Sequence, residues 1–135
     1  MSVRAVLPGI MKTILVLDDD IGIREALSSR LHKHVKDITV LTAPNGAEGV
    51  LILRSTPVDL ILTDLSMPIM DGYGVIECAR KDFPAVPICV MTANCSTDAA
   101  ARLHSLGIGR WIVKPFQMGK LAKMIAEELH LKNNS

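Results

Sequence analysis

The sequence alternates short apolar runs with amphipathic stretches, and this alternation limits the fold more than any other feature. Residues 13–17 form a run typical of a strand that is buried on both faces of a sheet. The same pattern recurs along the chain. It predicts four further strands, over residues 38–41, 58–63, 87–91 and 110–113.

The stretches between these runs have helical spacing. Ile23, Leu27 and Leu31 are four residues apart, which places them on one face of a helix over residues 23–31. Ser96 or Thr97 is suited to cap a later helix, which Gly107 would end. The other predicted helices are 47–53, 72–81, 96 or 97 to 106, and 117–129.

Five strands that alternate with five helices predict an α/β fold. The expected architecture is a doubly wound, five-stranded parallel sheet with helices on both faces. Its crossover connections should be right-handed. In open sheets of this kind, ligands bind beyond the carboxyl ends of the strands. The residues that end the strands are therefore the first candidates for a functional site.

Acidic, hydroxyl and basic side chains stand at these expected strand ends. Asp18, Asp19 and Asp20 follow the first strand, and Asp64 follows the third. The fourth strand ends at Thr92 and Ala93, and the fifth at Lys114. An acid at the end of a buried strand is costly unless something pairs with it. The pattern brings together at least three carboxylates and one ammonium, with a hydroxyl beside them.

Length and composition favour one ordinary globular domain. The chain has 135 residues, of which 49% are hydrophobic and 21% charged, and its formal net charge is +1. No basic excess indicates a nucleic-acid partner. No apolar run reaches the ~18–20 residues that span a bilayer. We expect a domain over residues 12–131, a loose extension over 1–11 and a polar tail over 132–135.

The cysteines and the absence of a second domain pattern bear on the setting. Cys78, Cys89 and Cys95 are odd in number and lack C-x-x-C spacing, which favours a reduced, cytoplasmic location. Nothing after the fifth strand except one helix is predicted. We therefore expect no DNA-binding or enzymatic output domain within these residues. If the chain is complete, we expect it to act through a partner protein, by docking or group transfer; if it is part of a longer protein, the output domain would lie elsewhere in that protein.

Taken together, the motifs resemble the receiver domain of bacterial two-component response regulators. The resemblance covers residues 12–131 and depends on the order and spacing of the motifs. It implies the flavodoxin-like strand order 2-1-3-4-5. The motifs are Asp18-Asp19, Asp64 with Met67-Pro68 and Asp71-Gly72, Thr92-Ala93, and Lys114-Pro115-Phe116.

The resemblance implies a phosphoacceptor role for Asp64. Its carboxylate would take a phosphoryl group from the phosphohistidine of a sensor histidine kinase and form an acyl phosphate. The transition state spreads negative charge over oxygen atoms, so positioned cations matter more than proton transfer. Lys114 and Thr92 are the residues expected to contact the phosphoryl oxygens.

The resemblance also implies a Mg²⁺ site. Asp19, Asp64 and the main-chain carbonyl of Ser66 would hold the ion, with Asp18 acting mostly through water. Without a cation, the three carboxylates would repel one another and raise one another's pKa values. Mg²⁺ and Lys114 would thus offset the charge of the buried Asp64.

A switch and a partner surface complete the expectation. A hydrogen bond from Thr92 to the phosphoryl group would draw its loop inward and free space for an aromatic residue on the fifth strand. The family usually has Tyr or Phe there, whereas this chain has Trp111, which is equally well explained as a core residue. The downstream partner is expected on the face of helix 4, strand 5 and helix 5, where Arg102 and Arg110 predict a basic surface.

Two of the acids have a simpler role, and two alternative functions fit the same fold or the same chemistry. Asp20 and Asp71 are more typical of helix caps than of ligands.

One alternative function is a phosphate-independent interaction module with the same fold, which the full set of motif residues disfavours. Another is an aspartyl-phosphate hydrolase of the haloacid dehalogenase kind. It would need a second acid two residues after the nucleophile, where this chain has Ser66.

Overall fold

The computed structural model describes residues 11–134, and the side chains as far as Leu129. The predicted extension over residues 1–11 lies outside the described residues apart from Met11. Within the described part of the chain, no helix combines the length and the apolar character needed to cross a bilayer.

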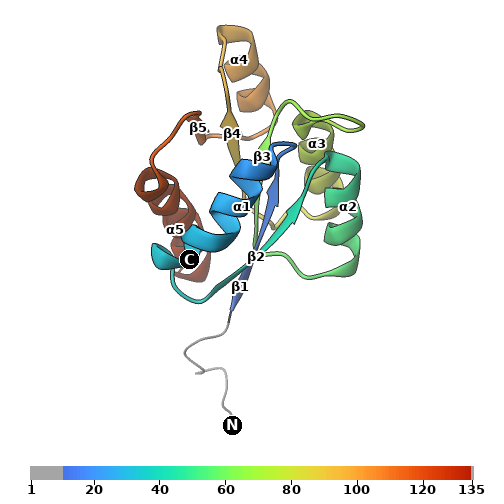
Figure 1. The fold of residues 1–135 in the computed structure, drawn as a ribbon. Helices are drawn as coiled ribbons and strands as arrows, with labels where there is room; N and C mark the ends of the chain where they lie inside the picture. Colours follow the sequence, from blue (N-terminus) through green and yellow to red (C-terminus); the bar gives the residue numbers. More distant parts are fainter. Residues whose placement is uncertain (1–10, 135) are drawn as a thin grey trace.

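Five parallel strands form one sheet in the order β2-β1-β3-β4-β5, which confirms the predicted topology (Figure 1). The central strands are the most deeply buried, and every residue of β3 and β4 is inaccessible to solvent or nearly so. The strands are β1 (Lys12–Leu17), β2 (Ile38–Ala43), β3 (Leu60–Asp64), β4 (Ile88–Thr92) and β5 (Trp111–Val113).

Helices cover both faces of the sheet, as predicted. One core cluster joins α1 and α5 to one face, and a second joins α2, α3 and α4 to the other (Figure 1). Successive strand residues point to opposite faces of the sheet, so Ile14 belongs to the first cluster and Leu15 to the second. The helices are α1 (Ile21–Arg30), α2 (Gly46–Ser55), α3 (Gly72–Asp82), α4 (Thr97–Ser105) and α5 (Met118–Asn134).

Side-chain caps fix where four of these helices begin. Asp20 accepts from the main-chain N–H groups of Gly22 and Ile23, and Asp71 accepts from that of Gly74. Ser96 caps α4, and Asn45 caps α2. The predictions that Asp20, Asp71 and Ser96 act as caps are confirmed. The caps also set the direction in which each loop leaves the carboxyl edge of the sheet.

Element boundaries differ from the predicted ones by a few residues. The first helix ends at Arg30 and continues as a single 3₁₀ turn, Leu31–Lys33. The third strand begins at Leu60, two residues later than predicted, and the carboxylate of Asp59 just before it accepts from the main-chain N–H of Thr13. The last helix runs to Asn134, beyond the predicted end at residue 129, since no Gly or Pro interrupts it after residue 119.

Candidate functional site

Three consecutive acids, Asp18, Asp19 and Asp20, form the loop between β1 and α1, which we call the acid loop (residues 18–20). The side chain of Asp18 is fully buried, while Asp19 and Asp20 are exposed. Asp18 Oδ1 accepts from the main-chain N–H of Asp20 at 2.9 Å, and Asp18 Oδ2 accepts from Lys114 Nζ at 2.6 Å. Both oxygens of Asp18 therefore accept hydrogen bonds within the protein, whereas the side chains of Asp19 and Asp20 face solvent.

Asp64 ends β3 and is 7% exposed. Its Oδ1 accepts from the main-chain N–H of Leu65 at 2.7 Å, and its Oδ2 accepts from Lys114 Nζ at 2.7 Å. The loop that follows closes tightly on this strand end, because a Cβ at Gly72 would lie 2.1 Å from the carbonyl oxygen of Asp64. Glycine at position 72 thus allows the loop to fold back and bury the base of the Asp64 side chain.

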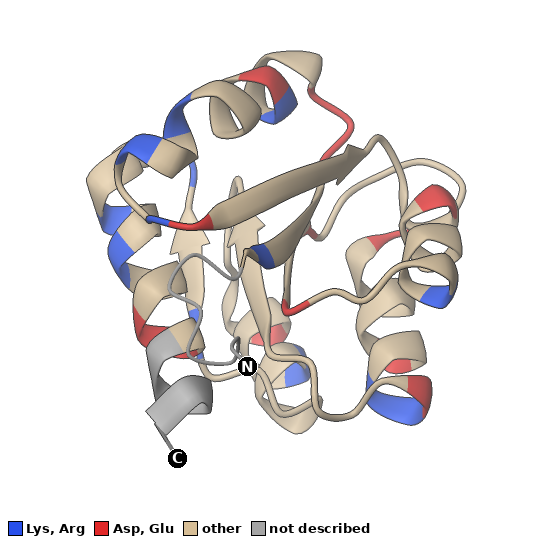
Figure 2. Ribbon diagram, turned by 90° about the horizontal axis from the view of Figure 1, so that it is seen from below, with Lys and Arg blue, Asp and Glu red and all other residues tan. Residues whose placement is uncertain are grey.

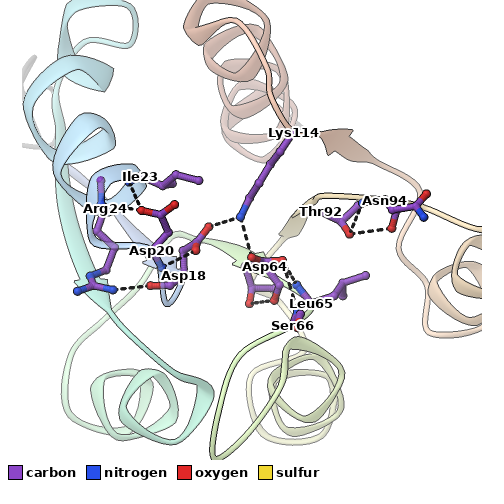
Figure 3. A network of polar contacts seen from close by, with 12 residues as sticks. Asp18, Asp20, Ile23, Arg24, Asp64, Leu65, Ser66, Thr92, Asn94 and Lys114 are labelled. Carbon is purple, nitrogen blue, oxygen red and sulfur yellow. Dashed lines mark hydrogen bonds and ion pairs between the residues drawn. The ribbon is translucent and has the colours of Figure 1, made fainter.

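Lys114 joins the two acids. Its ammonium bridges Asp18 and Asp64, and its side chain is only 15% exposed (Figure 3). The main-chain N–H of Lys114 donates to the carbonyl oxygen of Thr92 at 2.8 Å, which ties the ends of β4 and β5 together. The peptide bond between Lys114 and Pro115 is cis. The structure thus brings the ends of four strands to one pocket, as the sequence predicted.

The pKa values of Asp18 and Lys114 both lie above their ordinary values, for different reasons. Burial raises the pKa of the Asp18 carboxyl, and the hydrogen bond from Lys114 offsets only part of that rise. Burial lowers the pKa of the Lys114 ammonium, but its hydrogen bonds to Asp18 and Asp64 outweigh this, so the pKa lies above its ordinary value. Lys114 therefore stays charged at neutral pH, where it balances one of the acids.

The oxygen ligands of this pocket fit a divalent cation. Asp18, Asp19 and Asp64 each offer a carboxylate oxygen, and these atoms lie within 4.8 Å of one another. Three carboxylates and one ammonium leave a formal charge of −2, which one divalent ion would neutralise. Hard carboxylate oxygens with one solvent-facing member suit Mg²⁺, which keeps several waters. The main-chain N–H of Ser66 lies 3.4 Å from Asp64 Oδ1, so Ser66 lies beside the pocket.

The two residues predicted to form a switch lie at different depths. Thr92 is 5% exposed at the end of β4, and its hydroxyl donates to the carbonyl oxygen of Asn94 at 3.0 Å. Trp111 begins β5 and is half-buried against the core cluster of α2, α3 and α4. Packing of this kind agrees with the interpretation of Trp111 as a core residue and leaves part of its ring at the surface.

The predicted basic surface on α4, β5 and α5 is only partly correct. Arg110 forms ion pairs with Glu127 at 2.7 Å and Glu128 at 3.6 Å, so its charge is compensated by α5. The guanidinium of Arg102 lies 3.8 Å from the centre of the Tyr73 ring. Sequence reasoning missed these partners because they are distant along the chain. Lys and Arg positions occur on several helices, with Asp and Glu positions among them (Figure 2).

A groove of about 600 Å³ adjoins the pocket between α1 and the start of α5. Its walls are mainly apolar, with Ile23 and Leu27 on α1 and Phe116 and Met118 on the opposite side. Lys114 lines the end of the groove that meets the acid pocket. The groove therefore offers an apolar surface next to Lys114.

One contact in this region was not predicted from the sequence. Arg24 on α1 donates from Nη1 to the carbonyl oxygen of Asp18 at 2.7 Å. The sequence contained a signal for this contact. A cation in the first turn of a helix interacts unfavourably with the helix dipole, so its presence there indicates a compensating contact nearby.

A sheet of this order with a Lys-bridged pair of acids at its carboxyl edge defines a receiver-type α/β domain. The family model described as the response regulator receiver domain matches residues 14–126. The chain therefore belongs to the response regulator receiver family.

Solved structures agree with this assignment. A CheY-like response regulator receiver domain from Methanospirillum hungatei JF-1 superposes with a TM-score of 0.83 at 25% identity, covering 91% of this chain and 97% of that one. The chemotaxis protein CheY4 of Vibrio cholerae gives a TM-score of 0.79 at 28% identity, covering 87% of this chain and 98% of that one.

Curated relatives are longer proteins. The probable transcriptional regulator ycf27 of Cyanophora paradoxa is 37% identical over 125 residues, which are 91% of this chain and 50% of that protein. The transcriptional regulatory protein GlrR of Escherichia coli (strain K12) is 33% identical over 116 residues, 86% of this chain and 26% of that protein. The chain thus spans half or less of the length of these two relatives.

Proposed function

We propose that this receiver domain is a phosphoacceptor switch of a two-component system. Asp64 takes a phosphoryl group from the phosphohistidine of a sensor histidine kinase or phosphotransfer protein, and the change alters partner binding. The domain is a signalling protein that catalyses only its own phosphorylation and dephosphorylation. The observation that carries the proposal is the buried Asp64 carboxylate, held 2.7 Å from the Lys114 ammonium within a group of three acids.

The chemistry follows from the groups around Asp64. A carboxylate oxygen of Asp64 bonds to phosphorus while the phosphorus–nitrogen bond of the donor breaks, and the electron pair of that bond leaves with the imidazole. Lys114 stabilises the negative charge on the transferred oxygens, and the hydroxyl of Thr92 at the end of β4 hydrogen-bonds the product in this proposal. Asp19, Asp64 and the main-chain carbonyl of Ser66 would hold Mg²⁺, with Asp18 acting through water, and the ion would supply further positive charge to those oxygens.

Partner binding uses two surfaces in this proposal. The phosphoryl donor docks on the groove between α1 and the start of α5, since that groove reaches Lys114. The downstream partner docks on α4, β5 and α5, where a hydrogen bond from Thr92 to the phosphoryl group would shift the loop before α4. Free thiols at Cys78, Cys89 and Cys95 support a reducing, cytoplasmic setting.

Phosphorylation by a small donor tests the proposal directly. After incubation with acetyl phosphate and Mg²⁺, intact mass should show a labile gain of one phosphoryl group. The gain should be absent from Asp64→Ala and retained in Asp98→Ala, which removes an exposed carboxylate on α4. No gain in the wild-type chain would favour a phosphate-independent interaction module. Sustained turnover of assorted phosphomonoesters would instead indicate a hydrolase.

Coupling to the partner surface has its own test. Trp111 is the one tryptophan of the chain, and it lies on β5. Its fluorescence should change when Mg²⁺ and beryllofluoride are added together, and Asp64→Ala should abolish the response. A flat titration in a protein that still accepts phosphate would count against Trp111 as part of the switch.

A further inference from the structure

We infer that Arg24 is a positioning residue for Asp19, and that its contact with the acid loop sets the affinity of the pocket for Mg²⁺. The inference rests on the proposed function, because it takes the acid loop to hold that ion. Arg24 lies in the first turn of α1, and its side chain folds back toward the loop (Figure 3).

Arg24 contacts the main chain on both sides of Asp19, but only the contact with Asp18 is made by its side chain. Its Nη1 donates to the carbonyl oxygen of Asp18 at 2.7 Å, and its main-chain N–H donates to the carbonyl oxygen of Asp20 at 3.1 Å. The N–H of Asp18 donates to the carbonyl oxygen of Ala43 at 3.2 Å. The peptide before Asp19 is therefore held by the Arg24 side chain, and the peptide after it by the bond from Asp20 N–H to Asp18 Oδ1 at 2.9 Å. The carboxylate of Asp19 is exposed and near those of Asp18 and Asp64.

The position of this arginine is unfavourable for α1 by itself. Helix N-termini carry partial positive charge, so a cation in the first turn weakens an isolated helix. Within the described residues Arg24 forms no ion pair with a carboxylate, and its hydrogen bond goes to a main-chain oxygen. The compensation lies in the acid loop, whose negative charge exceeds what Lys114 alone can balance.

Arg24 and Lys114 act on Asp18 from different sides. Lys114 binds the carboxylate, whereas Arg24 binds the main-chain oxygen, and Asp18 lies between them (Figure 3). Arg24 therefore fixes the Asp18 carbonyl without occupying any carboxylate oxygen that a metal ion would need. Residues that orient metal ligands in this way typically change metal affinity by about 10–100-fold when they are removed.

Mg²⁺ titration by calorimetry on the full chain tests the inference. In Arg24→Ala the Kd for Mg²⁺ should rise by about tenfold, because the Asp19 peptide is no longer held. Arg24→Lys keeps the charge but carries a single ammonium on a shorter stem, so its Kd should also rise, by at least about threefold. The matched control is Arg30→Ala, which removes the same charge from an exposed position at the other end of α1 and should change the Kd by less than about twofold.

Several outcomes would overturn the inference. If Arg24→Ala binds Mg²⁺ like the wild type, or if Arg30→Ala loses as much affinity, the contact with Asp18 is not responsible. Thermal melting without Mg²⁺ identifies variants that are folded at the titration temperature. Should Arg24→Ala not fold there, Arg24→Lys decides, and wild-type affinity in that variant rejects the inference. A wild-type chain that binds no Mg²⁺ overturns both this inference and the proposed function, whereas normal wild-type binding with unaffected Arg24 variants overturns this inference alone.

Discussion

The centre of the sheet and its α4–β5 edge are packed very differently. Every residue of β3 and β4 is buried. By contrast, β5 is three residues long with no fully buried member, and α4, described along its whole length, buries Leu103 alone. Asp64 thus ends one of the two fully buried strands, while the proposed partner surface includes a short strand and a helix that are sparsely buried.

Polar contacts from α3 replace much of the missing apolar packing of α4. Arg80 donates from Nε to the carbonyl oxygen of Leu106 at 3.2 Å and from Nη2 to that of Gly107 at 3.1 Å. Arg102 stacks on Tyr73 at the other side of the helix. Such contacts can be exchanged for water at small cost, so α4 can move without opening the core. This fold therefore keeps the acid pocket fixed and leaves the proposed partner surface adjustable.

The largest expected effect comes from a cavity in the sheet centre. Leu62→Ala in β3 should cost about 3 kcal/mol of unfolding free energy, because the side chain is fully buried and its neighbours cannot collapse. Leu103→Ala on α4 removes an equally buried side chain. It should cost less, about 2 kcal/mol, because α4 can relax locally. Urea denaturation measures both.

Hydrogen exchange shows whether the two regions are separate. In Leu103→Ala the amides of α4 should lose protection while those of β3 keep it. In Leu62→Ala protection should fall across the sheet. Equal loss in β3 and α4 for the Leu103 variant would contradict the distinction between a rigid centre and a loosely held edge.

Gly72→Ala should have the next largest effect, about 2 kcal/mol or more. The new methyl would meet the main chain at Asp64 and Leu65, and a main chain cannot give way as a flexible side chain does. Gly119→Ala is the matched control, because a Cβ there meets nothing within 4 Å. In α5 it should be neutral or stabilise by about 0.5 kcal/mol. Thermal melting of both variants measures the difference, and similar Tm values would show that the loop adapts.

The sequence predicted most of the fold because its signals are local. Alternating apolar runs located all five strands, and caps such as Asp20 and Ser96 located helix starts. The strand-end rule then brought Asp18, Asp64 and Lys114 to one pocket without any knowledge of contacts. These predictions depend on the periodicity of apolar residues and on the direction of the chain. Both can be determined from short segments of the sequence.

Contacts between distant helices could not be predicted in this way. Arg110 was expected to make the partner surface basic. However, Glu127 and Glu128, which are distant in the sequence on α5, form ion pairs with it. Ile69 adopts a left-handed φ of 70°, which a β-branched residue rarely does and which no propensity scale would assign. Such features depend on how helices, strands and loops pack against one another, and this packing cannot be predicted from local sequence patterns.

A smaller effect is expected from the polar anchor of α4. Arg80→Ala should cost about 1 kcal/mol, because the carbonyl groups of Leu106 and Gly107 lose a charged donor. Arg54→Ala removes an exposed ion pair with Asp82 and should cost less. Urea denaturation gives both values, and exchange at the end of α4 should speed up only in the Arg80 variant. An Arg54 variant that is the less stable of the two would show that Arg80 is not an anchor.

The smallest expected effect is a difference in chemical labelling between two cysteines, Cys89 and Cys95, which are six residues apart. Cys89 in β4 is fully buried, and burial raises the pKa of its thiol to about 12. At pH 8 only about one Cys89 in ten thousand is a thiolate, and the reagent cannot reach it until the sheet opens. Cys95 lies half-buried in the loop before α4. Iodoacetamide should therefore label Cys95 in the native protein and leave Cys89 unlabelled until urea is added, as peptide mass mapping can show. Equal labelling rates for the two thiols would mean that the centre of the sheet opens as readily as its edge, because reaction at Cys89 requires the strand itself to be exposed.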